Sequence, residues 1–386
     1  MKNSGLGVNV VSHLRALKGR QPWRVFRRRP LTIIGAVLAM LASTSLASAA
    51  SVSPKLNKAT KSTTIKPDFK FFKGKQITFL ISGAPGGASS NFGEDQVGAL
   101  AKILGATINV QFIPGANVVT ADLLGAAKPD GLTFGIQSFQ GLISAVYSNT
   151  ATTNFPLVKA TYIGAGFQAP QMLFACLNSP YTSFSQVATA TKPVVDLSTA
   201  GASNIFGRLL LHTYRVPVQW LTGYSGFSAQ QAGCLRGDGN VAQNSAGNAT
   251  NAAGTGMPPG ETPLIISGPE PTGVPQAFLN SAVPTVASYA AKNPPPTKLG
   301  KLALKLLKLL FESHQPGNSF MGPAGIPKAR VLALTDAMKQ EMRMASVKAA
   351  LTSHGLPIGF NTGAAMLTAL KEGIKLQPQV EQFLSY

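Results

Sequence analysis

The stretch Lys75-Gln-Ile-Thr-Phe-Leu-Ile-Ser-Gly-Ala-Pro-Gly-Gly-Ala-Ser-Ser90 decides how this chain folds. Its apolar run, 77–81, predicts a strand that stops at a glycine turn, and apolar residues at helical spacing predict a helix over 91–104. The first backbone N–H groups of such a helix have no partner within the helix, and the helix dipole is positive there. The stretch therefore predicts a strand, a turn and a helix start that attracts an anion without a charged side chain.

The same alternation of strand and helix continues after this stretch. Strands are expected at 108–112 and 133–136, with a helix over 118–127 between them. Strands that alternate with helices favour an α/β fold built on a parallel sheet.

A second strand, polar loop and helix occur in the other half of the chain. Residues 194–197 predict the strand, the small polar residues 198–203 the loop, and 204–214 the helix. Two helix starts of this kind suggest one in each of two domains, facing each other across a cleft. Further strands are expected at 162–164, 171–177 and 264–267, further helices at 182–190, 298–312, 329–345, 347–354 and 366–374, and a long loop or insertion at 240–260.

The N-terminus has the features of a secretory signal. A basic segment precedes the apolar run 31–46, and Ala47-Ser48-Ala49 fits a cleavage site. The apolar run is shorter than the roughly 20 residues that a membrane span needs, which favours cleavage over an uncleaved anchor. Arg28 and Arg29 leave general secretion and twin-arginine export both open. We expect a signal peptide over 1–49, a tether over 50–73, and a periplasmic or otherwise extracytoplasmic protein.

The charge of the chain points to anionic partners. The formal net charge is +20, and the eight Lys and Arg residues within 1–50 account for eight of these charges, so the chain after cleavage carries 20 − 8 = +12. No Lys/Arg cluster is interleaved with aromatic residues, so a nucleic-acid partner is not expected. An attraction for anionic solutes or an anionic membrane face is the sounder interpretation.

Two cysteines, Cys176 and Cys234, are present in the 386 residues. In an oxidising compartment they could form a disulfide, and two buried thiols remain the alternative. His212, His314 and His354 lie at no metal-ligand spacing from one another or from a cysteine, so neither a metal nor another cofactor is expected.

Six short blocks in order resemble the solute-binding proteins of the tripartite tricarboxylate transporter family, also called Bug receptors. In this chain the blocks are 77–87, 114–116, 129–133, 283–287, 320–328 and the segment up to 354–356. They resemble, in this order, the family's strand with its APGG loop and its RPGAGG, PDGYT, VPTVAE, GLFAPAGTPK and LAALGLEP blocks. The blocks span roughly residues 75–375.

This resemblance implies a two-lobed fold of the type II periplasmic-binding-protein class, each lobe a sheet flanked by helices, with a ligand cleft between the lobes. The first lobe would comprise 74–160 and 286–386, and the second 161–285. The implied function is capture of a small organic carboxylate by a monomer that serves membrane transporter subunits. Such a protein is not an enzyme.

The resemblance also implies which residues contact the ligand. Backbone N–H and small hydroxyl groups of both lobes hold the carboxylate in this family. Carried over by position, the ligand-binding residues are Ala84, Pro85, Gly86, Gly87, Ser89, Ser90, Ser138, Ser198, Thr199, Gly201, Ser203 and Tyr224.

The chain departs from the family at its titratable positions. Ser90, Asn240 and Asn244 stand where the family has Asp, Ser225 where it has Lys, and about Asn204 where it has His. A pocket without Asp cannot pair with a ligand ammonium, so we expect plain carboxylates rather than amino acids.

Other functions stay open. A sensor that feeds a signalling partner such as a sensor kinase would use the same fold. A secreted hydrolase is disfavoured because 223–226 lacks the last spacing of a G-x-S-x-G elbow. Four lysines at helical spacing within 298–312 suggest either a membrane or partner contact or an ordinary solvated face.

Overall fold

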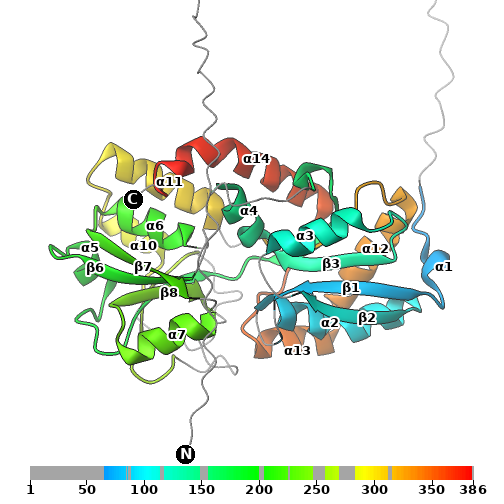
Figure 1. The fold of residues 1–386 in the computed structure, drawn as a ribbon, viewed down its shortest axis with the longest axis horizontal. Helices are drawn as coiled ribbons and strands as arrows, with labels where there is room; N and C mark the ends of the chain where they lie inside the picture. The colour runs from blue at the N-terminus through cyan, green and yellow to red at the C-terminus, as the bar shows by residue number, and fades with distance from the viewer. Residues whose placement is uncertain are drawn as a thin grey trace, which may run out of the picture. The chain divides into compact units, whose positions relative to one another are not determined.

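The computed structural model describes residues 65–384, apart from 84, 86–87, 114–116, 148–154, 200–203, 225–226, 247–256, 269–282 and 312–314. The expected signal peptide and most of the expected tether lie outside the described residues. The described residues belong to one compact unit. They form two sheets, each flanked by helices (Figure 1), so the expected two-lobed α/β fold is confirmed.

The first sheet has six strands in the order β11-β4-β10-β3-β1-β2. Their bounds are β1 Gln76–Ser82, β2 Thr107–Ile113, β3 Thr133–Ser138, β4 Thr161–Phe167, β10 Pro316–Gly322 and β11 Asn361–Thr362. Strand β1 pairs in parallel with both β2 and β3, as the sequence predicted. Strand β10 enters from late in the chain and runs antiparallel to β3 and β4, which makes the sheet mixed.

The second sheet has five strands in the order β7-β6-β8-β5-β9. Their bounds are β5 Gln171–Ala175, β6 Val194–Thr199, β7 Val218–Tyr224, β8 Val241–Ser245 and β9 Thr262–Ile266. Strand β8 is central, so the prediction of a loop throughout 240–260 was wrong for its first part. The reason is physical: after Val241 and Ala242 the strand continues with Gln243, Asn244 and Ser245, which give no apolar run.

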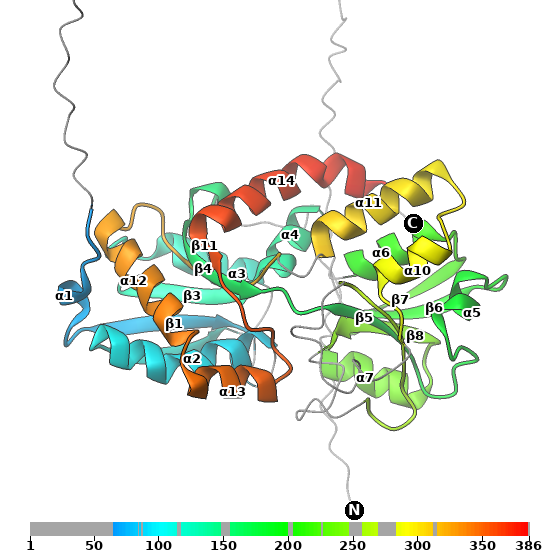
Figure 2. The ribbon, with the colours of Figure 1, turned by 180° about the vertical axis from the view of Figure 1, so that it is seen from behind.

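Helices cover both faces of the first sheet (Figures 1 and 2). The helices α2, α12 and α13 pack together, and α3, α4 and α14 lie on the other side. The bounds are α1 Phe69–Phe72, α2 Ala88–Leu104, α3 Asn117–Ala126, α4 Phe139–Tyr147, α12 Lys328–Glu341, α13 Ala345–Ser353 and α14 Gly363–Glu381, with a short 3₁₀ turn at Leu157–Lys159.

The second sheet carries five helices among its described residues. They are α5 Phe184–Ala188, α6 Ile205–Thr213, α7 Phe227–Arg236, α10 Val286–Lys292 and α11 Lys298–Phe311. Helix α11 packs along α6, with the Phe206 and Phe311 rings 5.4 Å apart in edge-to-face contact. The far end of α14 also reaches this lobe, where Arg208 Nη1 donates to the Leu384 carbonyl at 3.2 Å.

The chain therefore passes from one sheet to the other at residues that differ from the expected lobe boundaries. Residues 161–167 form β4 inside the first sheet, and α10 and α11 pack on the second lobe through Tyr289 and Phe311. The chain crosses between sheets at 168–170 and again after α11. A short apolar run such as 162–164 predicts a buried strand but not the sheet it joins.

Phenylalanine rings fill the core of the first lobe. Phe79 stacks on Phe320 with ring centroids 5.5 Å apart, and Phe134 and Phe92 pack at the edges of this pair. All four side chains are buried. Burial of aromatic rings of this size is the main source of stability for such a lobe. Among the described helices, none is long and apolar enough to cross a membrane.

Candidate functional site

A pocket of about 370 Å³ lies between the two sheets. Its described lining contains eight carboxamide and six hydroxyl side chains: Asn117, Gln140, Gln168, Gln171, Gln230, Gln243, Asn244, Asn318, Ser82, Ser89, Ser90, Ser138, Ser144 and Ser245. The remaining lining comes from glycine, alanine, proline, leucine and phenylalanine. No charged residue and no histidine belongs to the lining that the structure describes. The described part of the wall is therefore polar but uncharged.

The first lobe contributes the starts of three helices to the pocket. Helix α2 follows β1, α3 follows β2 and α4 follows β3. Because these strands are parallel, their carboxyl ends lie at one edge of the sheet, and the helices that follow begin there. Each helix start adds a partial positive charge and N–H groups, so this edge favours an anion.

The turn before α2 depends on glycine. Gly83 lines the pocket and has φ +99°, in a region that L-residues with a side chain rarely adopt. Its N–H donates to the Ile113 carbonyl at 2.9 Å, which ties the turn to the end of β2. Any side chain here would strain the backbone that leads into α2.

Hydrogen bonds within the first lobe hold the polar wall in place. Asn117 Oδ1 accepts from the Ser138 N–H at 3.2 Å, and Ser138 Oγ accepts from the Gly141 N–H at 3.2 Å. Ser89 Oγ donates to Asn318 Oδ1 at 2.8 Å and so links α2 to β10. These contacts fix the side chains before any ligand arrives, which lowers the entropy that binding costs.

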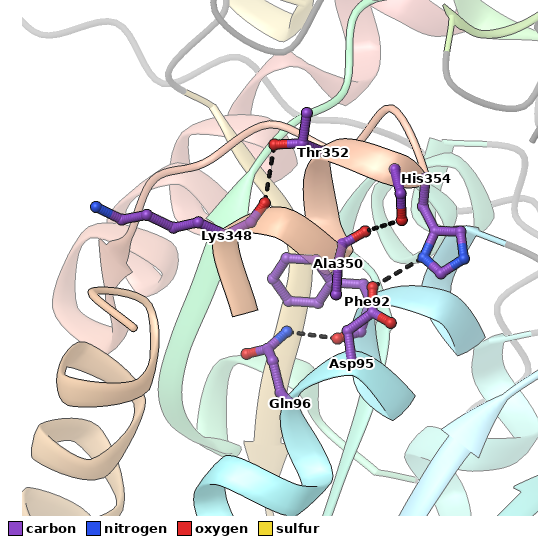
Figure 3. Close-up of polar contacts among 8 residues, drawn as sticks. Phe92, Asp95, Gln96, Lys348, Ala350, Thr352 and His354 are labelled. Carbon is purple, nitrogen blue, oxygen red and sulfur yellow. Dashed lines mark hydrogen bonds and ion pairs between the residues drawn. The ribbon is translucent and has the colours of Figure 1, made fainter. Parts of the chain in front are cut away.

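A contact between a histidine and an aspartate positions another part of the wall. His354 Nδ1 lies 2.9 Å from Asp95 Oδ2 and joins the end of α13 to α2 (Figure 3). The chain after His354 contributes Leu356 and Pro357 to the pocket. The contact therefore holds these two apolar residues beside Phe92, which also lines the pocket.

The second lobe contributes α7, the end of β8 and, from the start of β5, Gln171. Gln230 of α7 donates through Nε2 to the Leu197 carbonyl at 2.6 Å. Gln243 Oε1 accepts from the Gly207 N–H, which fastens the start of α6 to β8. A disulfide between Cys176 and Cys234 anchors α7 to the end of β5 and resolves the choice that the sequence left open.

A buried carboxyl lies in β6, shortly before this lobe's predicted loop in the sequence. Asp196 is 0% exposed, and burial raises its pKa from 3.8 to about 7, although a hydrogen bond from Asn204 and the charge of Arg208 oppose the rise. Asn204 Nδ2 donates to Asp196 Oδ1 at 3.0 Å. Asn204 therefore has a structural partner and does not stand in for a pocket histidine.

The predicted ligand-binding residues fall into three groups. Ser89, Ser90 and Ser138 line the pocket. Ala84, Gly86, Gly87, Gly201 and Ser203 lie outside the described residues, as does the side chain of Thr199. Pro85 is exposed, Ser198 is buried outside the described lining, and the Tyr224 hydroxyl donates to Asp238 Oδ2 at 3.0 Å, away from that lining.

Apart from Asn244, which stands where the family has Asp, the carboxamides of the lining were not predicted from the sequence. Gln140, Gln168, Gln230 and Gln243 belong to no motif, and amide side chains occur widely on protein surfaces. One signal was available: Gln243-Asn244-Ser245 follows two apolar residues, as polar residues at the open end of a buried strand do.

The chemistry of this wall suits the binding of a polar ligand. Hydroxyl and amide groups donate and accept hydrogen bonds, but a nucleophilic serine needs an adjacent base, and the described lining supplies none. Within the described part of the chain, no group of three or more His, Cys, Asp or Glu could hold a metal ion.

Comparison with known proteins gives relatives by structure but not by sequence. A scan against protein-family models finds no match, and a search of curated proteins finds none either. MatC (Rpa3494) from Rhodopseudomonas palustris with bound malate aligns at 20% identity over 80% of this chain and 99% of its own, with a TM-score of 0.61. R. palustris Rpa4515 with adipate aligns at 15% over 80% and 97%, with a TM-score of 0.61, and the periplasmic binding protein BugD at 15% over 81% and 97%, with a TM-score of 0.59. Similarity at this level shows that the chain shares the fold of these binding proteins.

Proposed function

We propose that this chain is an extracytoplasmic solute-binding protein, a divergent member of the tripartite tricarboxylate transporter receptors, that captures a small organic acid between its two lobes. The observation that carries the proposal is the pocket, whose described lining is uncharged. Three helix starts of the first lobe and three amide-bearing elements of the second lobe, α7, β8 and the start of β5, line it together. The structural neighbours that hold malate and adipate support a carboxylate as the ligand.

Carboxylate binding does not require a cation in the wall. A carboxylate that accepts two or three hydrogen bonds from fixed N–H and O–H groups is held by charge-assisted contacts, each stronger than a neutral hydrogen bond. Helix dipoles add to this attraction in a site from which water is excluded. Micromolar affinity corresponds to about 8 kcal/mol, which a few such contacts supply.

Binding and closure follow from the position of the pocket. A ligand that contacts both lobes at once stabilises the closed conformation, in which the lobes lie close together. Because the ligand makes fewer contacts in the open conformation, binding shifts the population toward the closed one. The closed form would then be presented to a pair of membrane transporter subunits. A cleavable leader would export the monomer to the extracytoplasmic side of the membrane.

A ligand screen tests this function. Thermal-shift measurements with about fifty organic acids, followed by titration calorimetry, should find carboxylates that bind with micromolar or better affinity. Replacing both Ser89 and Ser138 by Ala should weaken binding about 10-fold or more, because each loss removes a hydrogen-bonding group from the anion site. Ser346→Ala, at an exposed serine of α13, is the matched control and should bind as the wild type does. The proposal fails if no organic acid binds, or if the double variant keeps full affinity.

A further inference from the structure

Two glutamine side chains in the pocket wall each carry one buried polar atom without a partner. Gln168 is 4% exposed and Gln230 is 1% exposed, and both line the pocket. Gln168 Nε2 and Gln230 Oε1 have no hydrogen-bond partner. A buried polar atom that is left unpaired costs free energy, so a ligand that satisfies it gains affinity.

The backbone fixes which end of Gln230 remains unpaired. One end of its carboxamide lies 2.6 Å from the Leu197 carbonyl oxygen, which can only accept a hydrogen bond. That end must therefore be the NH₂ group. The unpaired end is the oxygen, so the second lobe offers an acceptor.

A relay of two contacts fixes Gln168 in the same way. The Gln140 amide lies 2.8 Å from the Leu310 carbonyl oxygen, so the contacting end of Gln140 is its NH₂ group. The same nitrogen lies 2.7 Å from the end of Gln168, which must then be the oxygen. The unpaired end of Gln168 is its NH₂ group, so the segment between the sheets offers a donor.

We infer that the ligand carries two complementary groups, a carboxylate for the Gln168 amide and a hydroxyl or amide N–H donor for Gln230 Oε1, and that the pocket therefore selects a hydroxy acid over the same acid without the hydroxyl. The inference rests on the proposed function and narrows its substrate class. The carboxylate lies on the Gln140 side, where α4 begins, because Gln140 joins that helix to Gln168. The donor points to the second lobe.

Two further observations bear on the donor group. Ser245 Oγ at the end of β8 also lines the pocket without a partner, and it can pair with a ligand hydroxyl as donor or acceptor. An ammonium would need a carboxylate to compensate for its desolvation, and the lining described here has none. A neutral donor, the hydroxyl above all, fits this wall.

Matched pairs of acids test the inference on the wild-type protein. Calorimetry with malate and succinate, lactate and propionate, 3-hydroxybutyrate and butyrate, and mandelate and phenylacetate compares acids that differ in one hydroxyl. In each pair that binds, the hydroxy acid should bind about 10- to 100-fold tighter, because its counterpart leaves Gln230 Oε1 unpaired. Equal or tighter binding of the acids without the hydroxyl overturns the inference and leaves the proposed function intact. If no organic acid binds at all, the proposed function fails and the inference fails with it.

Two variants separate the roles of the glutamines. Gln230→Leu should abolish the difference in affinity between the two acids of a pair, because it weakens the binding of the hydroxy acid alone. Gln168→Leu should weaken both members about equally, because both present the carboxylate. Gln219→Leu, at an exposed position of β7, should change neither affinity nor preference. A Gln230→Leu protein that keeps the native circular-dichroism spectrum and still prefers hydroxy acids contradicts the assignment.

Discussion

Glu341 of α12 is an ionisable side chain in an apolar environment. It is 0% exposed, and neither carboxyl oxygen has a hydrogen-bond partner. Burial raises its pKa from 4.5 to about 9. The folded protein therefore holds this proton over a pH range in which the unfolded chain has lost it.

This shift makes stability depend on pH with a definite sign. Between pH 4.5 and about 9 the folded state binds more protons than the unfolded state, so the free energy of unfolding falls as the pH rises. Burial also raises the pKa of Asp196 and of Glu261 to about 7, and both add to the fall at lower pH. The contribution of these three carboxyl groups to stability should therefore be complete below about pH 4 and should be lost as the pH rises toward 9.

Glu341→Gln should remove the alkaline part of this dependence. The variant should be about 1 kcal/mol or more stabler than the wild type at pH 9, since one pKa unit corresponds to about 1.4 kcal/mol. The free energy of unfolding of the variant should stop falling near pH 7, where Asp196 and Glu261 have titrated. Urea unfolding at pH 5, 7 and 9 measures this, and Glu372→Gln, at an exposed glutamate of α14, is the control. Identical pH profiles for the variant and the wild type would show that Glu341 is not buried.

Individual residues of the site were predictable only where a motif marked them. Ser89, Ser90 and Ser138 were expected because the resemblance to the family marks their positions, and all three line the candidate pocket. The orientation of the Gln168 and Gln230 carboxamides could not be predicted. It depends on the carbonyl oxygen of Leu310 for Gln168 and on that of Leu197 for Gln230, and both are far away in the sequence. Contacts of that kind exist only after the chain has folded.

Among the secondary-structure elements, α7 depends most on a covalent link. Its Cys234 is bonded to Cys176 at the end of β5, across 58 residues of sequence. The same helix carries Gln230, so the disulfide holds a pocket residue as well as the fold. A crosslink that closes a loop of this length stabilises mainly by restricting the unfolded chain.

Replacing Cys176 and Cys234 together by Ser should lower the free energy of unfolding by about 2–4 kcal/mol. Urea denaturation with and without dithiothreitol measures the change. The reductant should destabilise the wild type by a similar amount and leave the variant unaffected. Stability that is unchanged in both experiments would mean that no disulfide forms.

Strands and helices with a clear apolar pattern were predictable, and those without it were not. Strand β1 has the pattern, with Ile77, Phe79 and Ile81 all buried. Strand β10 lacks it because Pro316, Gly317 and Asn318 occupy its first half. The lysines of α11 are exposed while Leu306 and Leu310 are buried, which fits a solvated surface.

The arrangement of the two lobes follows from three connections that the sequence did not reveal. Residues 168–170 lead from β4 to β5, the chain after α11 leads back to β10, and α14 extends from the first sheet to Arg208 of the second lobe (Figure 2). A sequence pattern shows which face of an element is buried but not which sheet it joins, so the lobe boundaries could not be predicted. The pocket between the sheets is a product of this arrangement.

A crystal structure of the protein with a bound organic acid tests the proposed capture most directly. The carboxylate should lie in the pocket, within hydrogen-bond distance of the start of α4 and of Gln168, and the rest of the ligand should extend to Gln230 of the second lobe. A ligand that contacts one lobe alone, or that binds outside this pocket, would contradict the proposal.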